Sequence, residues 1–114
     1  MAGGRESNRG AVESMSLRLI VRPEAEQDIA PAAVWYEEKD NGLGFEFLAE
    51  IRNAINRSLQ NPELFARLRR EPEVRRILAR RFPYRFFFIN RKDAVVVFAV
   101  LHVARHDHHW RRLV

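Results

Sequence analysis

Cysteine is absent from the 114-residue chain, which excludes disulfides, thiolate metal ligands and cysteine nucleophiles. Glycine is scarce, with 5 residues, and none of them forms the Gly-rich loop that cradles phosphate groups. Long hydrophobic runs are missing, because the longest, Ala94 to Leu101, falls far short of the ~20 residues that a helix needs to cross a bilayer. The first 15 residues hold no apolar segment typical of a secretory signal. We therefore expect a cytoplasmic protein.

Lysine is also scarce, since all but 2 of the 20 basic residues are arginine, the side chain that pairs bidentately with carboxylates and phosphates. The charge is unevenly distributed. Residues 1–66 hold 7 basic and 11 acidic residues, whereas residues 67–114 hold 13 basic and 4 acidic ones, a net charge of +9. Such a region attracts a nucleic acid or an acidic protein. The alternative is a solvated face that only keeps a small protein soluble.

Hydrophobic patterning indicates a short extension followed by one domain. Residues 1–15 are rich in glycine and polar side chains and have no periodicity, which predicts a disordered N-terminal extension. The patterned sequence starts directly after Met15, so either Met1 or Met15 is the natural start. The remaining residues, 16–114, fit a single domain with its own core.

Two amphipathic helices are predicted after a short strand at residues 17–22. The first begins near Pro23 and ends at Asn41-Gly42, and Pro31 predicts either a kink or a restart with Asp28 as the N-cap. The second covers residues 44–60, and the short link between them indicates an antiparallel helical hairpin. The side chains that we expect to be buried are Ala25, Ile29, Ala32 or Ala33, Trp35 and Tyr36 in the first helix, and Phe45, Leu48, Ile51 or Arg52, Ile55 and Leu59 in the second.

The C-terminal part has the composition of strands. Strands are predicted over residues 74–80, 84–90 and 94–103, and the turn at 90–93 joins the last two as a hairpin. Their continuous apolar character predicts central strands that are covered by the helices on one face and partly covered on the other. Residues 62–72 read as a connector with a turn of helix. The expected fold is α+β in the order β-α-α-β-β-β, with a helical hairpin on a small, mostly antiparallel sheet.

Histidines form the first candidate site. His102, His106, His108 and His109 lie close together in the sequence, but their spacing matches no zinc motif. We therefore expect no metal and no cofactor, and interpret them as acid/base or solvent-facing residues. A nucleophilic triad has no support, because no serine or cysteine stands in a suitable turn.

Arginines near the strands form the second candidate site. Arg76 lies within one predicted strand, Arg85 within the next, and Arg105 just beyond the last. Because neighbouring strands are ~4.8 Å apart, arginines on one face of adjacent strands can converge. Such a cluster can hold a scissile phosphate and stabilise its transition state. The alternative is that each arginine pairs with a carboxylate or lies on an exposed face.

Three stretches together resemble one family. They are Val-Arg-Pro-Glu-Ala-Glu-Gln-Asp-Ile at 21–29, Arg-Arg-Phe-Pro-Tyr-Arg-Phe-Phe-Phe at 80–88 and Val-Val-Val-Phe-Ala-Val-Leu-His-Val-Ala-Arg at 95–105. In this order and spacing, with Trp-Tyr-Glu at 35–37, the sequence resembles the RelE/ParE toxin superfamily over residues 16–112.

The resemblance implies the toxin of a type II toxin–antitoxin module, as found on bacterial plasmids and chromosomes. Such a toxin is neutralised by an acidic antitoxin whose C-terminal segment folds over it, so the resemblance also implies a toxin–antitoxin hetero-oligomer and no membrane. The positive charge of residues 67–114 is in keeping with that partner.

The superfamily has two activities. RelE-like members cleave mRNA on the ribosome without a metal, using basic strand residues and a C-terminal tyrosine or histidine, whereas ParE-like members poison DNA gyrase. The resemblance places Arg85 and Arg105 on basic positions of the RelE-like site. It places Arg76 on one of two lysine positions, the other of which holds Leu78.

Other positions favour the ParE-like branch. Trp110 and Arg111 stand where the RelE-like tyrosine is expected, which leaves His102, His108 or His109 as a candidate acid/base. Phe82-Pro83-Tyr84, together with His102 and Arg105, looks closer to ParE-like members. We therefore expect a ParE-like gyrase poison. The alternatives are a RelE-like mRNA endoribonuclease, in which case the chain is an enzyme, and a non-toxic protein- or nucleic-acid-binding module of the same fold.

Overall fold

The computed structural model describes residues 18–105 and 107–114. The predicted extension at residues 1–15, and with it the choice between Met1 and Met15, lies outside the described residues. The elements are β2 (Arg18–Val21), α2 (Pro23–Lys39), α3 (Leu43–Gln60), the 3-10 turn η1 (Pro62–Leu64), β3 (Ala66–Arg70), β4 (Glu73–Leu78), β5 (Tyr84–Asn90), β6 (Ala94–His102) and the 3-10 helix η2 (Asp107–Leu113). The predicted α+β class is confirmed. No helix in these ranges is both long and apolar enough to cross a membrane.

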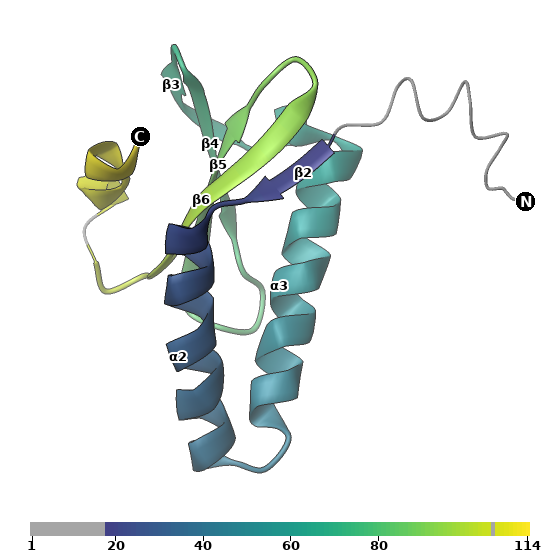
Figure 1. The fold of residues 1–114 in the computed structure, drawn as a ribbon, viewed down its shortest axis with the longest axis vertical. Coiled ribbons are helices and arrows are strands. Elements are labelled where there is room, and N and C mark those ends of the chain that lie inside the picture. The colour runs from purple at the N-terminus through teal and green to yellow at the C-terminus, as the bar shows by residue number, and fades with distance from the viewer. Residues whose placement is uncertain (1–17, 106) are drawn as a thin grey trace, which may run out of the picture.

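The strands form one mixed sheet in the order β2-β6-β5-β4-β3. β2 pairs with β6 in parallel, and the other neighbours are antiparallel. The interpretation of residues 62–72 as a connector was wrong for its second half, because residues 66–70 form the edge strand β3 (Figure 1). The segment Ala-Arg-Leu-Arg-Arg has no β-branched or aromatic residue, so its strand conformation comes from pairing with β4 and not from its own preference.

The antiparallel hairpin of α2 and α3 covers one face of the sheet, here called the helix face (Figure 1). Its turn is built around Gly42, whose φ of 91° suits a residue without a side chain. The Glu37 carboxylate accepts hydrogen bonds from the backbone N–H groups of Gly42 and Gly44, both at 2.9 Å. These contacts satisfy amide groups at the start of α3 that have no partner within the helix.

Three details of the hairpin differ from prediction. α2 runs unbroken through Pro31, so of the two predicted alternatives, a kink or a restart at Asp28, the restart is wrong. Phe45 is 77% exposed and Trp35 52% exposed, so neither belongs to the core. The Lys39 ammonium instead lies over the Trp35 ring, with Nζ 4.8 Å from the ring centroid. The buried face of α3 is rotated by about one residue from the predicted stripe. Its buried residues are Gly44, Phe47, Glu50, Ile51, Ala54 and Ser58.

The opposite face of the sheet, here called the outer face, has its own apolar cluster. Val74, Phe87, Ile89, Phe98 and Leu101 are buried there under residues Trp110 and Leu113 of η2. β6 is therefore buried on both faces from Ala94 to Leu101, which explains its unbroken apolar sequence. The prediction of central strands covered on both faces is confirmed.

A close approach between the helices gives a stability prediction. A Cβ atom on Gly44 would lie 2.7 Å from the backbone oxygen of Ala33 and 2.9 Å from Oε1 of Glu37. We expect Gly44→Ala to lower the free energy of unfolding by about 1–3 kcal/mol, because the helices must separate to admit the methyl group. Urea unfolding followed by circular dichroism measures this. Asn53→Ala, on the exposed side of α3, is the control and should stay within about 0.5 kcal/mol of wild type; equal stability of the two variants would contradict the prediction.

Candidate functional site

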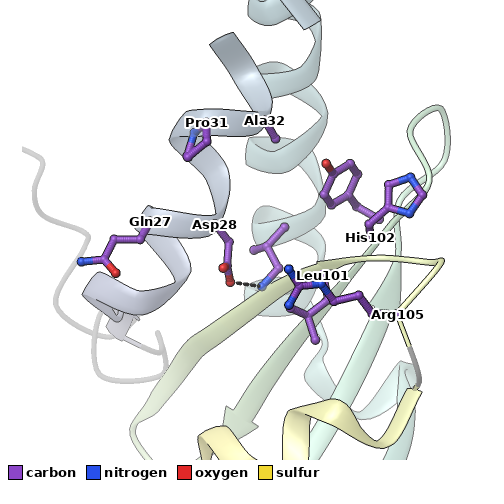
Figure 2. A pocket seen from close by; sticks show the side chains of 9 residues that line it. Gln27, Asp28, Pro31, Ala32, Leu101, His102 and Arg105 are labelled. Carbon is purple, nitrogen blue, oxygen red and sulfur yellow. Dashed lines mark hydrogen bonds between the residues drawn. The ribbon is translucent and has the colours of Figure 1, made fainter. Parts of the chain in front are cut away.

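A cleft of about 330 Å³ opens between α2 and the C-terminal end of β6 (Figure 2). It contains two of the four predicted site residues, one at the end of β6 and one in the loop that follows. The residues that line the cleft are Gln27, Asp28, Pro31, Ala32, Tyr84, Val100, Leu101, His102 and Arg105.

Asp28 lies at the base of this cleft because β2 is shorter than β6. β2 ends at Val21, and the last bond of this edge runs from the Arg22 N–H to the Val97 carbonyl at 2.9 Å. Beyond that point no strand among the described residues pairs with the free edge of β6. The Val100 N–H instead donates to Asp28 Oδ2 at 3.0 Å (Figure 2). The carboxylate thus satisfies a backbone group that the sheet leaves unpaired.

Burial sets the electrostatics of Asp28. Desolvation raises the pKa of its carboxyl above the usual 3.8, and the Val100 hydrogen bond, Arg105 and His109 oppose this only in part. The Arg105 side chain turns into the cleft towards Asp28 (Figure 2), yet no ion pair joins the two within the described residues. A half-buried carboxylate with a raised pKa that faces a cation in a cleft is typical of functional sites.

Tyr84 and His102 form the wall of the cleft. They are direct partners across the β5–β6 pair, and their rings meet edge to face at 5.2 Å. His102 Nδ1 accepts from the Ala104 N–H at 2.9 Å, so in the neutral imidazole the proton is on Nε2. Burial raises the pKa of the Tyr84 hydroxyl, which therefore remains a hydrogen-bond donor at neutral pH.

Arg76 and Arg85 lie on the other side of the sheet. Arg76 is paired with Phe87 and Arg85 with Leu101, and both partners belong to the cluster on the outer face. Arg76 and Arg85 therefore share the outer face, whereas the Arg105 side chain lines the cleft on the helix face.

Arg85 nevertheless contacts the loop that carries Arg105. Its Nη1 donates to the Val103 carbonyl at 3.2 Å and to the Arg105 carbonyl at 3.5 Å. The loop is also closed by the Arg105 N–H, which donates to the His102 carbonyl at 3.0 Å. Arg85 thus supports the position of Arg105 from the opposite side of the sheet.

The remaining candidates have other roles or lie outside the described part. Trp110 is 4% exposed and stacks on Phe87 with ring centroids 6.4 Å apart, so it serves packing on the outer face. Leu78, at the second RelE-like lysine position, is exposed. His106 and the side chain of His108 lie outside the described residues. Among the described residues, no group of histidine and carboxylate side chains could hold a metal ion.

Sequence reasoning missed Asp28 and Tyr84 as members of the site. Asp28 stands three residues after Ala25 and four before Ala32, on the buried stripe of α2. An acidic residue on an apolar stripe was the available signal, because burial of an ionised group is costly without a specific partner. Tyr84 had no such signal, since its contact with His102 depends on the pairing of two strands.

Asp28 leads to a pH-dependent prediction. Because its folded-state pKa is raised, ionisation costs stability, and the stability that the protonated group contributes is lost as pH rises through that pKa. Asp28→Asn keeps an oxygen acceptor for the Val100 N–H and cannot ionise. We expect the Asn variant to gain stability relative to wild type between about pH 4 and pH 7, as measured by urea unfolding at several pH values.

Asp28→Ala is the matched control, because it removes both the charge and the acceptor. It should lower the free energy of unfolding by about 1–3 kcal/mol, since the Val100 N–H then has no partner in the cleft. If the Asn variant were instead less stable than wild type at neutral pH, the carboxylate would be stabilising, contrary to the direction of its pKa shift.

A hairpin of two helices on a mixed five-stranded sheet, with a basic C-terminal part, is the architecture of the RelE/ParE superfamily of toxins. The sequence profile of the family described as the ParE toxin of type II toxin–antitoxin system, parDE, matches residues 19–107, and the chain belongs to this family. The resemblance seen in the sequence motifs is thereby confirmed.

Among solved structures, one chain from the chromosomal ParDE TA system from P. aeruginosa matches with a TM-score of 0.62 and 16% sequence identity. The match covers 76% of this chain and 96% of that chain, and it shows that the two share a fold. No curated protein matches the sequence significantly.

Proposed function

We propose that this toxin poisons DNA gyrase and is neutralised by an acidic antitoxin. The observation that carries the proposal is the division of the predicted basic site between two faces of the sheet. Arg76 and Arg85 lie on the outer face, whereas Arg105 and His102 share their cleft with the Asp28 carboxylate. A ribonuclease site needs cations that converge on one phosphate, and a carboxylate beside Arg105 repels a phosphodiester.

Gyrase poisoning does not require cations that converge on one phosphate, because it requires contact with a protein. A cleft with a carboxylate, a guanidinium and two aromatic rings suits polar side chains of a protein partner. The match to the ParE toxin family over residues 19–107 supports this branch over the RelE-like one.

The antitoxin proposal has support on the helix side of the molecule. An apolar groove of about 660 Å³ runs along α2 and α3 next to β2. Leu19 and Leu48 line it and are 42% and 39% exposed. An exposed apolar groove of this kind suits the apolar side of an amphipathic segment, and the positive charge of residues 67–114 favours an acidic one.

The proposed target is tested with purified protein and with cells. We expect growth arrest on induced expression, DNA-damage signalling without rapid loss of translation, and cleaved plasmid when the toxin is added to gyrase and supercoiled DNA. Arg105→Ala should reduce gyrase-dependent cleavage at least tenfold, which corresponds to about 1.4 kcal/mol of lost binding. Arg52→Ala, an exposed arginine of α3, should behave as wild type.

Other results would exclude the proposal. Rapid loss of translation with cleaved mRNA and intact gyrase activity identifies the RelE-like endoribonuclease. Absence of growth arrest identifies a non-toxic binding module. An effect of Arg52→Ala equal to that of Arg105→Ala would show that general charge, and not the cleft, determines activity.

A further inference from the structure

The edge strand β3 carries three arginines within five residues. Arg67, Arg69 and Arg70, here called the arginine strip, are all exposed. None of the three makes an ion pair or a side-chain hydrogen bond with another described residue. β3 is the outermost strand of the sheet and is paired on one side only (Figure 1). The strip is therefore accessible from the open edge of the sheet.

The strip has a cost in stability. Arg67 is the direct cross-strand partner of Arg75, and like charges in that position destabilise a sheet. A register shift between Arg67 and Arg69 interrupts the ladder, and Leu68 packs into the cluster on the outer face. As a result the exposed long side chains of β3 all end in guanidinium groups.

Nearby acidic residues compensate the strip only partly. Glu73 is the direct cross-strand partner of Arg70 and interacts electrostatically with Arg67. It also accepts hydrogen bonds from Arg75 Nε at 2.5 Å and from Asn90 Nδ2 at 3.0 Å, so its single charge is shared among several groups. Glu71, in the turn after β3, is the nearest exposed acid in the sequence. Over residues 66–78 there are five arginines against two glutamates, so this hairpin is positive.

We propose that the arginine strip binds the phosphate backbone of duplex DNA. Because of the register shift, Arg67 to Arg70 lies opposite Arg75 to Glu73, two residue steps of β4. At ~3.3 Å per step this is about 7 Å, the axial distance spanned by three successive phosphates of one strand. Arginine forks match phosphate oxygens and carry no base preference in such contacts. The binding does not depend on gyrase being the target, and it supplies a second attachment point when the toxin meets gyrase on DNA.

An acidic protein is the competing ligand, and the apolar surface argues against it here. Protein interfaces need a desolvated apolar centre, and the apolar groove lies beside β2, at the edge of the sheet opposite β3. Around the strip the apolar side chain of β3, Leu68, is turned into the outer-face cluster. A surface on which five arginines outnumber two glutamates suits a phosphate backbone, which offers only anions.

The test is fluorescence anisotropy with a labelled 20-base-pair duplex at several salt concentrations. Three phosphate contacts predict a slope of about −2.7 for the logarithm of the binding constant against the logarithm of salt, or about a 40-fold loss of affinity between 50 and 200 mM salt. The triple variant R67Q/R69Q/R70Q should bind at least tenfold more weakly and lose most of this slope. A duplex of unrelated sequence should bind equally well.

The matched control is R18Q/R52Q/R112Q, which removes the same charge from exposed arginines outside β3. Equal losses in both triple variants would overturn the proposal in favour of general charge. Unchanged DNA binding in the strip variant, with weaker binding of a polyglutamate peptide, would assign the strip to an acidic protein. Unchanged DNA binding with new self-association would assign it to protection of the sheet edge. A variant that loses gyrase poisoning but still binds DNA would bear on the proposed target and would leave the DNA-binding proposal unchanged.

Discussion

Trp110→Ala is expected to lower the free energy of unfolding by about 3–5 kcal/mol. The indole is 4% exposed and, with Leu113, covers the apolar cluster on the outer face of the sheet. It stacks on Phe87 at an interplanar angle of 24°, and its removal leaves that ring without cover. The free energy of unfolding of a domain of this size is about 5–15 kcal/mol in total, so the expected loss is a large fraction of it. Urea unfolding and binding of the dye ANS to exposed apolar surface measure it.

Trp110→Phe is the control for this prediction. A phenyl ring keeps most of the apolar contact with Phe87, so we expect a clearly smaller loss, no more than about half that of the alanine variant. Arg111→Ala, an exposed neighbour on η2, should change stability by less than about 0.5 kcal/mol. Unfolding of Trp110→Ala at the wild-type urea concentration, without added ANS binding, would mean that η2 does not protect the outer face.

The sequence predicted the centre of the fold well and its edges less well. The predicted strands at 84–90 and 94–103 agree with β5 and β6. Their β-branched and aromatic residues favour buried strands whatever the rest of the chain does. β3 was not predicted, since its strand conformation depends on β4. The buried face of α3 was misjudged because Phe45 and Phe47 both fit a helical stripe, and only contact with the sheet selects Phe47.

The candidate site was predictable only where residues are close in sequence. His102 and Arg105 share the cleft because both lie at the end of β6. Arg76 and Arg85 lie on the face of the sheet opposite the Arg105 side chain because of the strand register. A shift of the register by one residue would move every side chain of a strand to the other face. Asp28 enters the site because β2 ends before β6, and no local pattern in α2 encodes the length of another strand.

Arg75→Ala is expected to have an effect as large as that of Trp110→Ala. The Arg75 side chain is 11% exposed, and its Nε donates to Glu73 while Nη1 donates to the carbonyls of Phe65 at 2.6 Å and Glu63 at 3.3 Å. These bonds attach the segment between α3 and β3 to the sheet. Removing the guanidinium leaves two carbonyls without this donor and the Glu73 carboxylate with its bond from Asn90 alone, so we expect a loss of about 3–5 kcal/mol, measured by urea unfolding.

The pH dependence of the Arg75 variant distinguishes this cause from simple loss of packing. Hydrogen bonds from Asn90 and Arg75 hold the pKa of Glu73 below its usual 4.5. The stability that this pairing contributes is therefore present above about pH 4.5 and is lost as pH falls through the lowered pKa. Arg75→Ala should bring the Glu73 pKa closer to its usual value and weaken the acid sensitivity. Arg70→Ala, exposed on β3, should change stability by less than about 0.5 kcal/mol. An Arg75 variant that is destabilised equally at acid and neutral pH would show that the guanidinium acts by packing and not by its bond to Glu73.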